Sequence, residues 1–171
     1  AGKVARATAG SLTRAINSSR FKGETGQSLT VMAPAGVSAT RIVLIGLGEA
    51  ERVDDLAAQS FGGRAWKALA DTGEKSATMA IDPIKGSMLK TWEFSANAAY
   101  GAQLGSYRFD KYRTREKAEA KPSVSTLTVT SRDSAEARKA YRPMKKVADG
   151  VFMTRDLVSE PANVIYPISL A

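Results

Sequence analysis

The stretch Tyr107-Arg108-Phe109-Asp110-Lys111-Tyr112-Arg113-Thr114 follows a predicted helix, and it alternates aromatic residues with charges of both signs. A second stretch of mixed charge, Arg155-Asp156-Leu157-Val158-Ser159-Glu160-Pro161-Ala162-Asn163, ends the last predicted helix. Proline has no backbone N–H to continue the helical hydrogen bonds, so the chain is expected to leave the helix before Pro161. The other elements of the fold precede these two stretches or lie between them.

Four helices are predicted from apolar residues that recur at steps of three and four. They cover residues 7–19, 55–71, 91–107 and 133–158. The last has the clearest apolar stripe, formed by Ala140, Tyr141, Met144, Val147, Ala148, Val151 and Phe152. Pro143 lies within this helix, and because it lacks a helical donor we expect a kink or a new helix start there.

Four strands are expected between the helices, at residues 28–33, 40–45, 75–81 and 124–130. The short connection between the first two predicts an antiparallel hairpin. The uninterrupted apolar run in the second is typical of a central strand that is buried on both faces. Gly62-Gly63 in the second helix indicates close packing against the sheet. Helices that alternate with strands predict an α/β layer sandwich with a mixed sheet.

The composition allows one compact domain and excludes several kinds of chemistry. The chain has 171 residues, of which 43% are hydrophobic, and it contains neither cysteine nor histidine. Disulfides, thiolate zinc sites, histidine-ligated metals and a Ser-His-Asp triad are therefore excluded within these residues. No apolar run approaches the roughly 20 residues that a membrane span requires, and no signal peptide is evident. We expect a cytoplasmic domain without membrane contact.

The net charge of +8 is concentrated in one part of the chain, since residues 101–150 hold twelve Lys or Arg and six Asp or Glu. With the aromatic residues of 107–112, the basic side chains could contact the phosphates and bases of a nucleic acid. The candidates are Arg108, Lys111, Arg113, Arg115, Lys117, Arg138, Arg142 and Lys145. A solvated basic face is the other interpretation. Glu116 and Glu119 weaken the patch because they can pair with Arg115 or Lys121.

Two motifs resemble ligand-binding motifs, but the residues around them argue against a bound ligand. Gly46-Leu47-Gly48 follows a strand, as in dinucleotide-binding loops, but Glu51 occupies the position of the third glycine. We interpret it as a turn. Asp54-Asp55 is suited to capping the next helix and needs no metal. No acid/base pair, nucleophile or metal-ligand cluster stands out, so no catalytic residue, metal ligand or bound cofactor is predicted in this chain.

Four segments resemble, in order, the leucyl aminopeptidase (cytosol aminopeptidase) family. They are Phe21-Lys22-Gly23-Glu24-Thr25-Gly26-Gln27, the strand and turn at 42–48, and the stretches 107–114 and 155–163. The third is similar to the family motif Tyr-Arg-Phe-Asp-x-Tyr-Lys-Thr, with Arg113 where Lys is usual. The fourth is similar to Arg-Asp-Leu-Val-Asn-Glu-Pro-Ala-Asn, with Ser159 in place of Asn.

The resemblance implies a macro-domain-like three-layer sandwich, with a mixed sheet flanked by helices, over residues 1–132. A linking helix at 133–158 would follow, and 159–171 would begin a catalytic domain that these residues do not include. That domain carries two divalent metals, such as manganese or zinc, held by Lys, Asp and Glu side chains. It releases N-terminal residues from peptides, and six subunits assemble.

The implied role of this chain is that of a non-catalytic N-terminal domain, which supports assembly and shapes access to the active site. Its partners would be its own catalytic domain, other subunits of the hexamer and, in the parent enzyme, peptide substrates. DNA stays an alternative partner. An ADP-ribose-type ligand is suggested by analogy with the macro-like fold alone.

Overall fold

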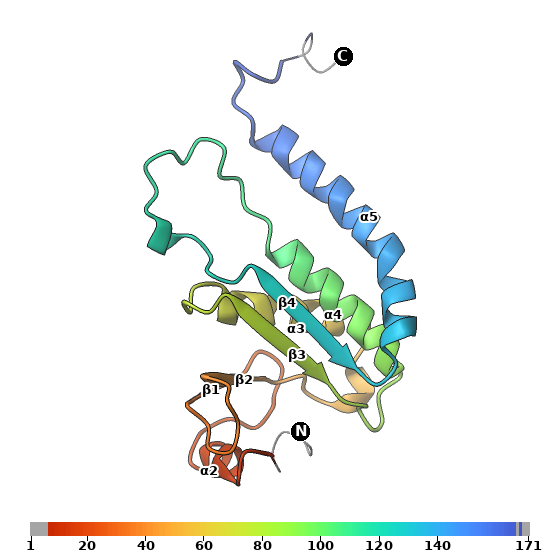
Figure 1. Cartoon of the computed structure of the whole chain (residues 1–171). Coiled ribbons are helices and arrows are strands. Elements are labelled where there is room, and N and C mark those ends of the chain that lie inside the picture. Colours follow the sequence, from red (N-terminus) through yellow and green to blue (C-terminus); the bar gives the residue numbers. More distant parts are fainter. Residues whose placement is uncertain (1–6, 167, 169–171) are drawn as a thin grey trace.

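The computed structural model describes residues 7–166 and residue 168 (Figure 1). Parts of the predicted segments 1–132 and 159–171 therefore lie outside the described residues. The elements in chain order are α2 (Ser11–Asn17), β1 (Ser28–Met32), β2 (Arg41–Ile45), η1 (Ala50–Arg52), α3 (Asp55–Ala70), β3 (Ser76–Ile81), α4 (Thr91–Gly105), η2 (Ala118–Ala120), β4 (Thr126–Ser131) and α5 (Ser134–Ser159). The predicted alternation of helices and strands is confirmed.

The first helix is shorter than the predicted 7–19. Ala9 and Gly10 have φ values of 46° and 77°, which lie in the left-handed region that a right-handed helix cannot contain. Helix α2 therefore begins only at Ser11. No helix in the described part of the chain is long and apolar enough to cross a membrane.

Strands β1 and β2 form the predicted antiparallel hairpin, with Ser28 opposite Ile45 and Met32 opposite Arg41. The expectation that β2 is a central strand was wrong, because among the described residues it pairs only with β1. All five residues of β2 are half-buried. Helix α2 packs against β1 and helix α3 packs against β2. The contact with α3, and the packing of Ile45 against the core, account for part of the apolar run in β2.

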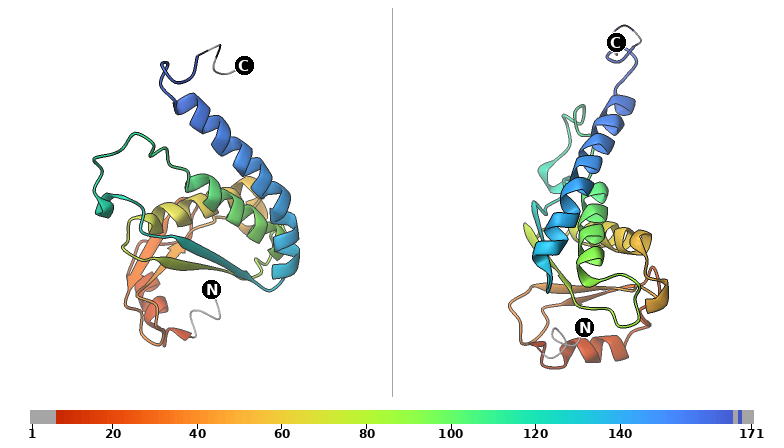
Figure 2. Two further views of the ribbon diagram at one scale, coloured as in Figure 1. Left: turned by 45° about the horizontal axis from the view of Figure 1, so that its top comes forward. Right: turned by 90° about the vertical axis from the view of Figure 1, so that its right-hand side faces the viewer.

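Strands β3 and β4 are parallel, from Ser76 opposite Thr126 to Ile81 opposite Ser131. Alternate residues of β3, including Met79 and Ile81, are buried in the core together with residues of α3 and α4. Figures 1 and 2 show these helices on one face of the β3–β4 pair. The intervening threonines of both strands are exposed. The strands of the described residues therefore form two separate pairs, one antiparallel and one parallel, within an α/β fold of small sheets flanked by helices.

The core lies between α3, α4 and the β3–β4 pair. Its buried residues are Val53, Ala58, Ala65, Met79, Ile81, Phe94, Ala98 and Ala102. A Cβ atom on Gly62 would lie 1.9 Å from the carbonyl oxygen of Ala98, and one on Gly101 would lie 1.9 Å from that of Gln59. The glycine pair in α3 therefore serves close packing against α4. The prediction that it packs against the sheet was wrong.

Helix α5 is a single helix of 26 residues that includes Pro143, so no new helix begins there. The helix curves along its length, and its first half packs on α4 (Figure 1). Of the predicted apolar stripe, only Ala148 is fully buried. The end of α5 projects beyond the strands (Figure 2). This position leaves one side of the stripe exposed.

Candidate functional site

The loop at residues 107–116 lies against the last turns of α5, and we call this contact the loop–helix junction. The Tyr107 hydroxyl donates a hydrogen bond to Oδ1 of Asp156 at 2.9 Å. The Tyr107 ring lies 5.3 Å from the Phe152 ring between centroids. The Arg155 guanidinium carbon lies 3.8 Å from the centroid of the Tyr107 ring, within cation–π range. Tyr107 is thus held by side chains from two neighbouring turns of α5.

Glu160, at the C-terminal end of α5, accepts hydrogen bonds from two side chains of the same loop. The Lys111 ammonium donates to Oε1 of Glu160 at 2.6 Å, and the Tyr112 hydroxyl donates to its other carboxylate oxygen. The Glu160 side chain is only 9% exposed. The hydrogen bonds from Lys111 and Tyr112 lower the pKa of Glu160, and the bond to Glu160 raises the pKa of Lys111. Glu160 is therefore held as a carboxylate.

Arg108 organises the loop itself. Its Nε donates to Oδ1 of Asp110 at 2.6 Å, and another nitrogen of the guanidinium pairs with Glu116. Arg113 also lies 3.6 Å from Glu116. The bond from Arg108 lowers the pKa of Glu116. The guanidinium of Arg108 further donates to the carbonyl oxygen of Ala120 at 3.3 Å, which ties the loop to η2. These charges neutralise one another within the loop.

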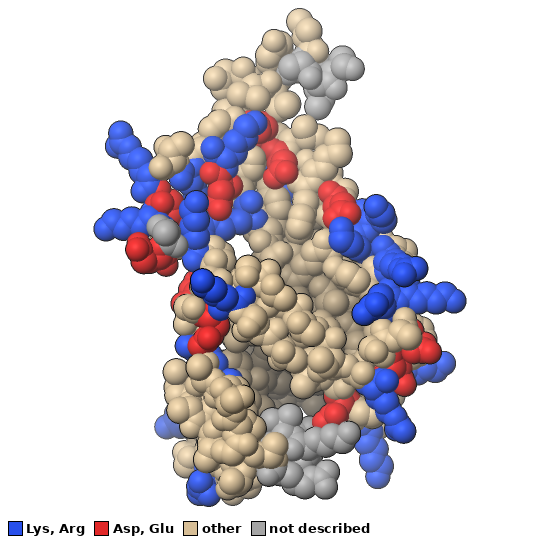
Figure 3. All heavy atoms as spheres, in the orientation of Figure 1, with Lys and Arg blue, Asp and Glu red and all other residues tan. Residues whose placement is uncertain are grey.

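The eight basic residues proposed from the sequence fall into two groups. Arg108, Lys111, Arg113, Arg115 and Lys117 lie in or beside the junction, whereas Arg138, Arg142 and Lys145 lie on α5. Figure 3 shows the basic side chains of the two regions on opposite sides of the face drawn, with mostly uncharged surface between them.

Four of these eight residues are paired with carboxylates. They are Arg108, Lys111 and Arg113 in the junction, and Lys145, which lies 3.3 Å from Asp149. Within the described part of the chain the other four make no ion pair. Contact with a nucleic acid stays a prediction that nothing in this arrangement strengthens.

The carboxylates that hold the junction differ from those expected. Glu116 pairs with Arg108 and Arg113, so the expected pairing with Arg115 or Lys121 was wrong. Asp156 and Glu160 were not identified as partners of the 107–116 loop. The opposite charges of the two quoted stretches were the available signal, but their partners are 48 and 49 residues away in the sequence.

The two other segments that resemble the family, residues 21–27 and 42–48, also contact each other. A Cβ atom on Gly46 would lie 2.0 Å from the carbonyl oxygen of Glu24, and the N–H of Gly48 donates to the carbonyl oxygen of Gly23 at 2.9 Å. The chain then forms the short 3₁₀ helix η1 before α3. Close packing on the 23–26 turn explains both glycines, and residues 46–48 form part of an irregular connection between β2 and η1.

The acidic pair before α3 acts in helix capping and packing. Oδ1 of Asp54 accepts a hydrogen bond from the N–H of Ala57 at 2.8 Å, as predicted for an N-cap residue. Oδ1 of Asp55 accepts from the buried side chain of Asn97 at 2.8 Å. Among the described residues, no three His, Cys, Asp or Glu side chains lie close enough together to hold a metal ion.

The comparisons with known proteins all point to one protein family. The family model for the N-terminal domain of the cytosol aminopeptidase family matches residues 1–116. A probable cytosol aminopeptidase of Caulobacter vibrioides is 41% identical over 165 residues, which is 96% of this chain and 32% of the relative. A probable cytosol aminopeptidase of Gluconobacter oxydans is also 41% identical, over 95% of this chain and 31% of the relative. The chain spans about a third of the length of these relatives.

Solved structures share the fold. A mutant of tomato leucine aminopeptidase superposes with a TM-score of 0.76 at 25% identity, covering 99% of this chain and 32% of the tomato chain. The bottromycin maturation enzyme BotP in complex with Mn superposes with a TM-score of 0.70 at 22% identity, covering 88% of this chain and 30% of that chain, and this likeness shows the fold alone. The chain belongs to the cytosol aminopeptidase family and corresponds to its N-terminal domain.

Proposed function

We propose that this chain is the non-catalytic N-terminal domain of a longer, metal-dependent aminopeptidase that releases N-terminal amino acids from peptides. The observation that carries the proposal is the match along nearly the whole chain to cytosol aminopeptidases of about three times its length. Among the described residues, no group of three His, Cys, Asp or Glu side chains could hold a metal ion. The domain would support assembly and shape access to the active site.

The junction supplies a structural role within this proposal. We assign residues 1–132 to the domain, 133–158 to a linking helix and 159–171 to the beginning of the catalytic domain. Tyr107, Lys111 and Tyr112 hold the last turns of α5 through Asp156 and Glu160. The direction in which the chain leaves α5 is thereby set by the 107–116 loop. A rigid exit would place the catalytic domain in one orientation.

Exposed apolar side chains at the end of α5 support a contact with that domain. Val158 is 81% exposed and Met153 is 65% exposed. Tyr112, whose hydroxyl reaches Glu160 at the end of α5, is 49% exposed. Exposed apolar side chains at the end of a helix can be covered by another part of a protein. We propose that the catalytic part of the same polypeptide covers them.

The two divalent metals, manganese or zinc, would be held by Lys, Asp and Glu side chains elsewhere in the longer protein, because the described residues do not fit such a site. When bound, a metal pair polarises the scissile carbonyl and activates a water molecule. From the same family resemblance we propose a hexamer with peptide substrates. The name of the relatives, cytosol aminopeptidase, supports a cytoplasmic location. The comparisons do not support the alternative of a nucleic-acid-binding module.

The test is a peptidase assay of two proteins side by side. The chain of 171 residues and the longer protein would each be given leucine 4-nitroanilide with Mn²⁺ or Zn²⁺. We expect turnover by the longer protein and none by the chain alone. Metal-dependent turnover by the chain alone would disprove the non-catalytic assignment, and an inactive longer protein would disprove the aminopeptidase assignment.

A further inference from the structure

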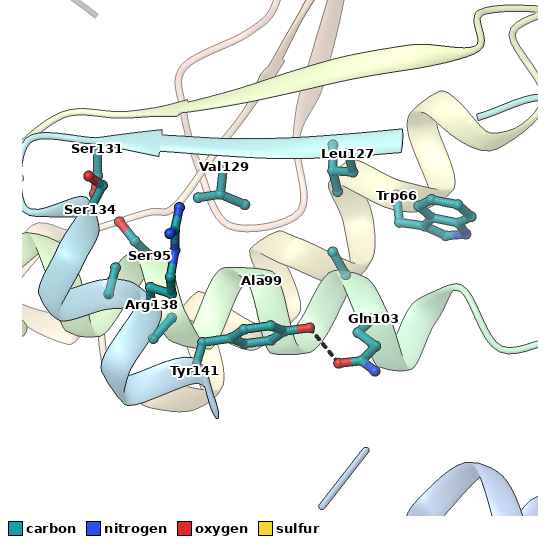
Figure 4. A pocket seen from close by; sticks show the side chains of 13 residues that line it. Trp66, Ser95, Ala99, Gln103, Leu127, Val129, Ser131, Ser134, Arg138 and Tyr141 are labelled. Atoms are coloured by element: carbon teal, nitrogen blue, oxygen red, sulfur yellow. Dashed lines mark hydrogen bonds between the residues drawn. The ribbon is translucent and has the colours of Figure 1, made fainter. Parts of the chain in front are cut away.

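A pocket of about 340 Å³ lies where β4, α4 and the first half of α5 meet, with Trp66 of α3 at one end (Figure 4). This volume is at the lower end of the range for small-molecule sites, roughly 300–1,000 Å³. The walls follow from the periodicity of each element. Strand β4 contributes the alternate residues Leu127, Val129 and Ser131, whereas α5 contributes residues at helical spacing, among them Ser134 and Arg138.

Small side chains keep the pocket open. Ala96, Ala99 and Ala102 line the wall formed by α4, and Ala137 faces them from α5. Across the pocket the Tyr141 hydroxyl donates to Oε1 of Gln103 at 2.6 Å (Figure 4). This bond fixes the spacing of α5 and α4 where the alanines leave room. The cavity is therefore a consequence of how the helices are held.

The pocket is apolar along most of its length and positively charged at one end. Leu127 and Val129 lead towards Trp66, whereas Arg138, Ser131 and Ser134 lie at the opposite end (Figure 4). The Arg138 guanidinium points towards β4, and within the described part of the chain it makes no ion pair. None of the lining residues is acidic. An unpaired guanidinium beside an apolar wall favours a carboxylate, which it can bind with two parallel hydrogen bonds.

We propose that this pocket binds a small monocarboxylate with an aromatic or aliphatic body. The carboxylate lies at Arg138, within reach of the hydroxyls of Ser131 and Ser134, and the body extends towards Trp66. A free amino acid fits less well, because no acidic side chain receives its ammonium group. The site goes beyond the proposed function, since no step of peptide hydrolysis depends on it.

The experiment is a titration of the ¹⁵N-labelled chain with 4-phenylbutyrate, followed through the indole N–H signals of its two tryptophans. We expect a saturable shift of Trp66 and no shift of Trp92, which does not line the pocket. The neutral 4-phenylbutan-1-ol and the cationic 4-phenylbutylamine should bind more weakly. Arg138→Gln should weaken binding by about tenfold or more, as expected for loss of a charge-assisted pair.

Two further variants keep the test decisive. Arg142→Gln removes an exposed charge one turn further along α5, outside the pocket lining, and should bind as the unsubstituted chain does. Ala99→Leu should abolish binding by filling the cavity. Equal affinity for the acid and the alcohol, or unchanged affinity in Arg138→Gln, would overturn the carboxylate assignment. Equal shifts of Trp66 and Trp92, or full binding by Ala99→Leu, would overturn the site itself.

Discussion

Gly62 is the residue on which the closest approach of α3 and α4 depends. A methyl group there would lie 1.9 Å from the carbonyl oxygen of Ala98. On α4, a methyl group on Gly101 would lie 1.9 Å from the carbonyl oxygen of Gln59. Glycine in a helix interior costs roughly 0.5–1 kcal/mol relative to alanine. The packing of the two helices around Ala58 and Phe94 offsets this cost.

The adjacent glycine provides a matched comparison. Gly62→Ala should lower the free energy of unfolding by about 1–3 kcal/mol or more, because the added methyl overpacks the helix contact. At Gly63 the nearest atom to an added Cβ is 3.6 Å away. Gly63→Ala should therefore raise the free energy of unfolding by roughly 0.5–1 kcal/mol. Urea unfolding followed by circular dichroism measures both, and equal effects in the two variants would refute this account of the contact.

At the scale of elements, the end of α5 carries charges that its own helix does not favour. Asp156 and Glu160 lie at its C-terminus, where the helix dipole is negative, and its last turn contains no basic residue. The 107–116 loop supplies the compensating donors, Tyr107, Lys111 and Tyr112. Loop and helix therefore stabilise each other, and neither conformation is expected to persist without the other.

This dependence predicts an acid-sensitive junction. The pKa of Glu160 is lowered in the folded chain, so its stabilising effect is complete above the pKa of an unfolded glutamate. The effect is lost as the pH falls through the lower, folded value. Glu160→Gln should lower the melting temperature at pH 7, and the difference from the unsubstituted chain should be smaller at about pH 3, below the pKa of an unfolded glutamate.

The control for this prediction is an exposed ion pair elsewhere. Glu49 and Arg52 lie 2.8 Å apart, and both side chains are largely exposed. Exposed pairs of this kind contribute little to stability. Glu49→Gln should therefore melt as the unsubstituted chain does at both pH values. A difference between Glu160→Gln and the unsubstituted chain that persists undiminished in acid would contradict the proposed role of the Glu160 carboxylate.

At the scale of the whole molecule, the apolar end of α5 is exposed in the chain and is expected to be covered in the longer protein. Val158→Asp should leave the stability of the 171-residue chain nearly unchanged, since the residue is 81% exposed. In the longer protein it should lower the free energy of unfolding by about 1.5–3 kcal/mol or more, because a buried valine contributes about that much. It should also reduce the assembled fraction.

Thermal unfolding and light scattering of both proteins would measure these effects. Met32→Asp on β1, which is also largely exposed, is the control because β1 lies at the opposite end of the molecule from the C-terminal end of α5 (Figure 1). It should have little effect in either protein. If Val158→Asp behaves alike in the chain and in the longer protein, the catalytic part does not cover this surface.

The elements themselves were predictable from the sequence because their signals are local. Apolar residues at helical spacing place the helices, and the Asp54 cap acts on Ala57 three residues away. The short connection between β1 and β2 predicts their antiparallel pairing. The quoted motifs likewise identified the family, since they are continuous in sequence. Each of these signals depends on interactions between near neighbours in the chain.

Other features were decided only by the tertiary structure. Which element lies against Gly62, how the strands divide into two pairs, and which carboxylate pairs with Arg108 depend on the approach of separate elements. The Lys111–Glu160 bond spans 49 residues, and the pocket combines side chains from α3, α4, β4 and α5. Side-chain periodicity shows which face of an element is buried. It does not show what covers that face, because packing is non-directional and several partners would bury the same apolar area.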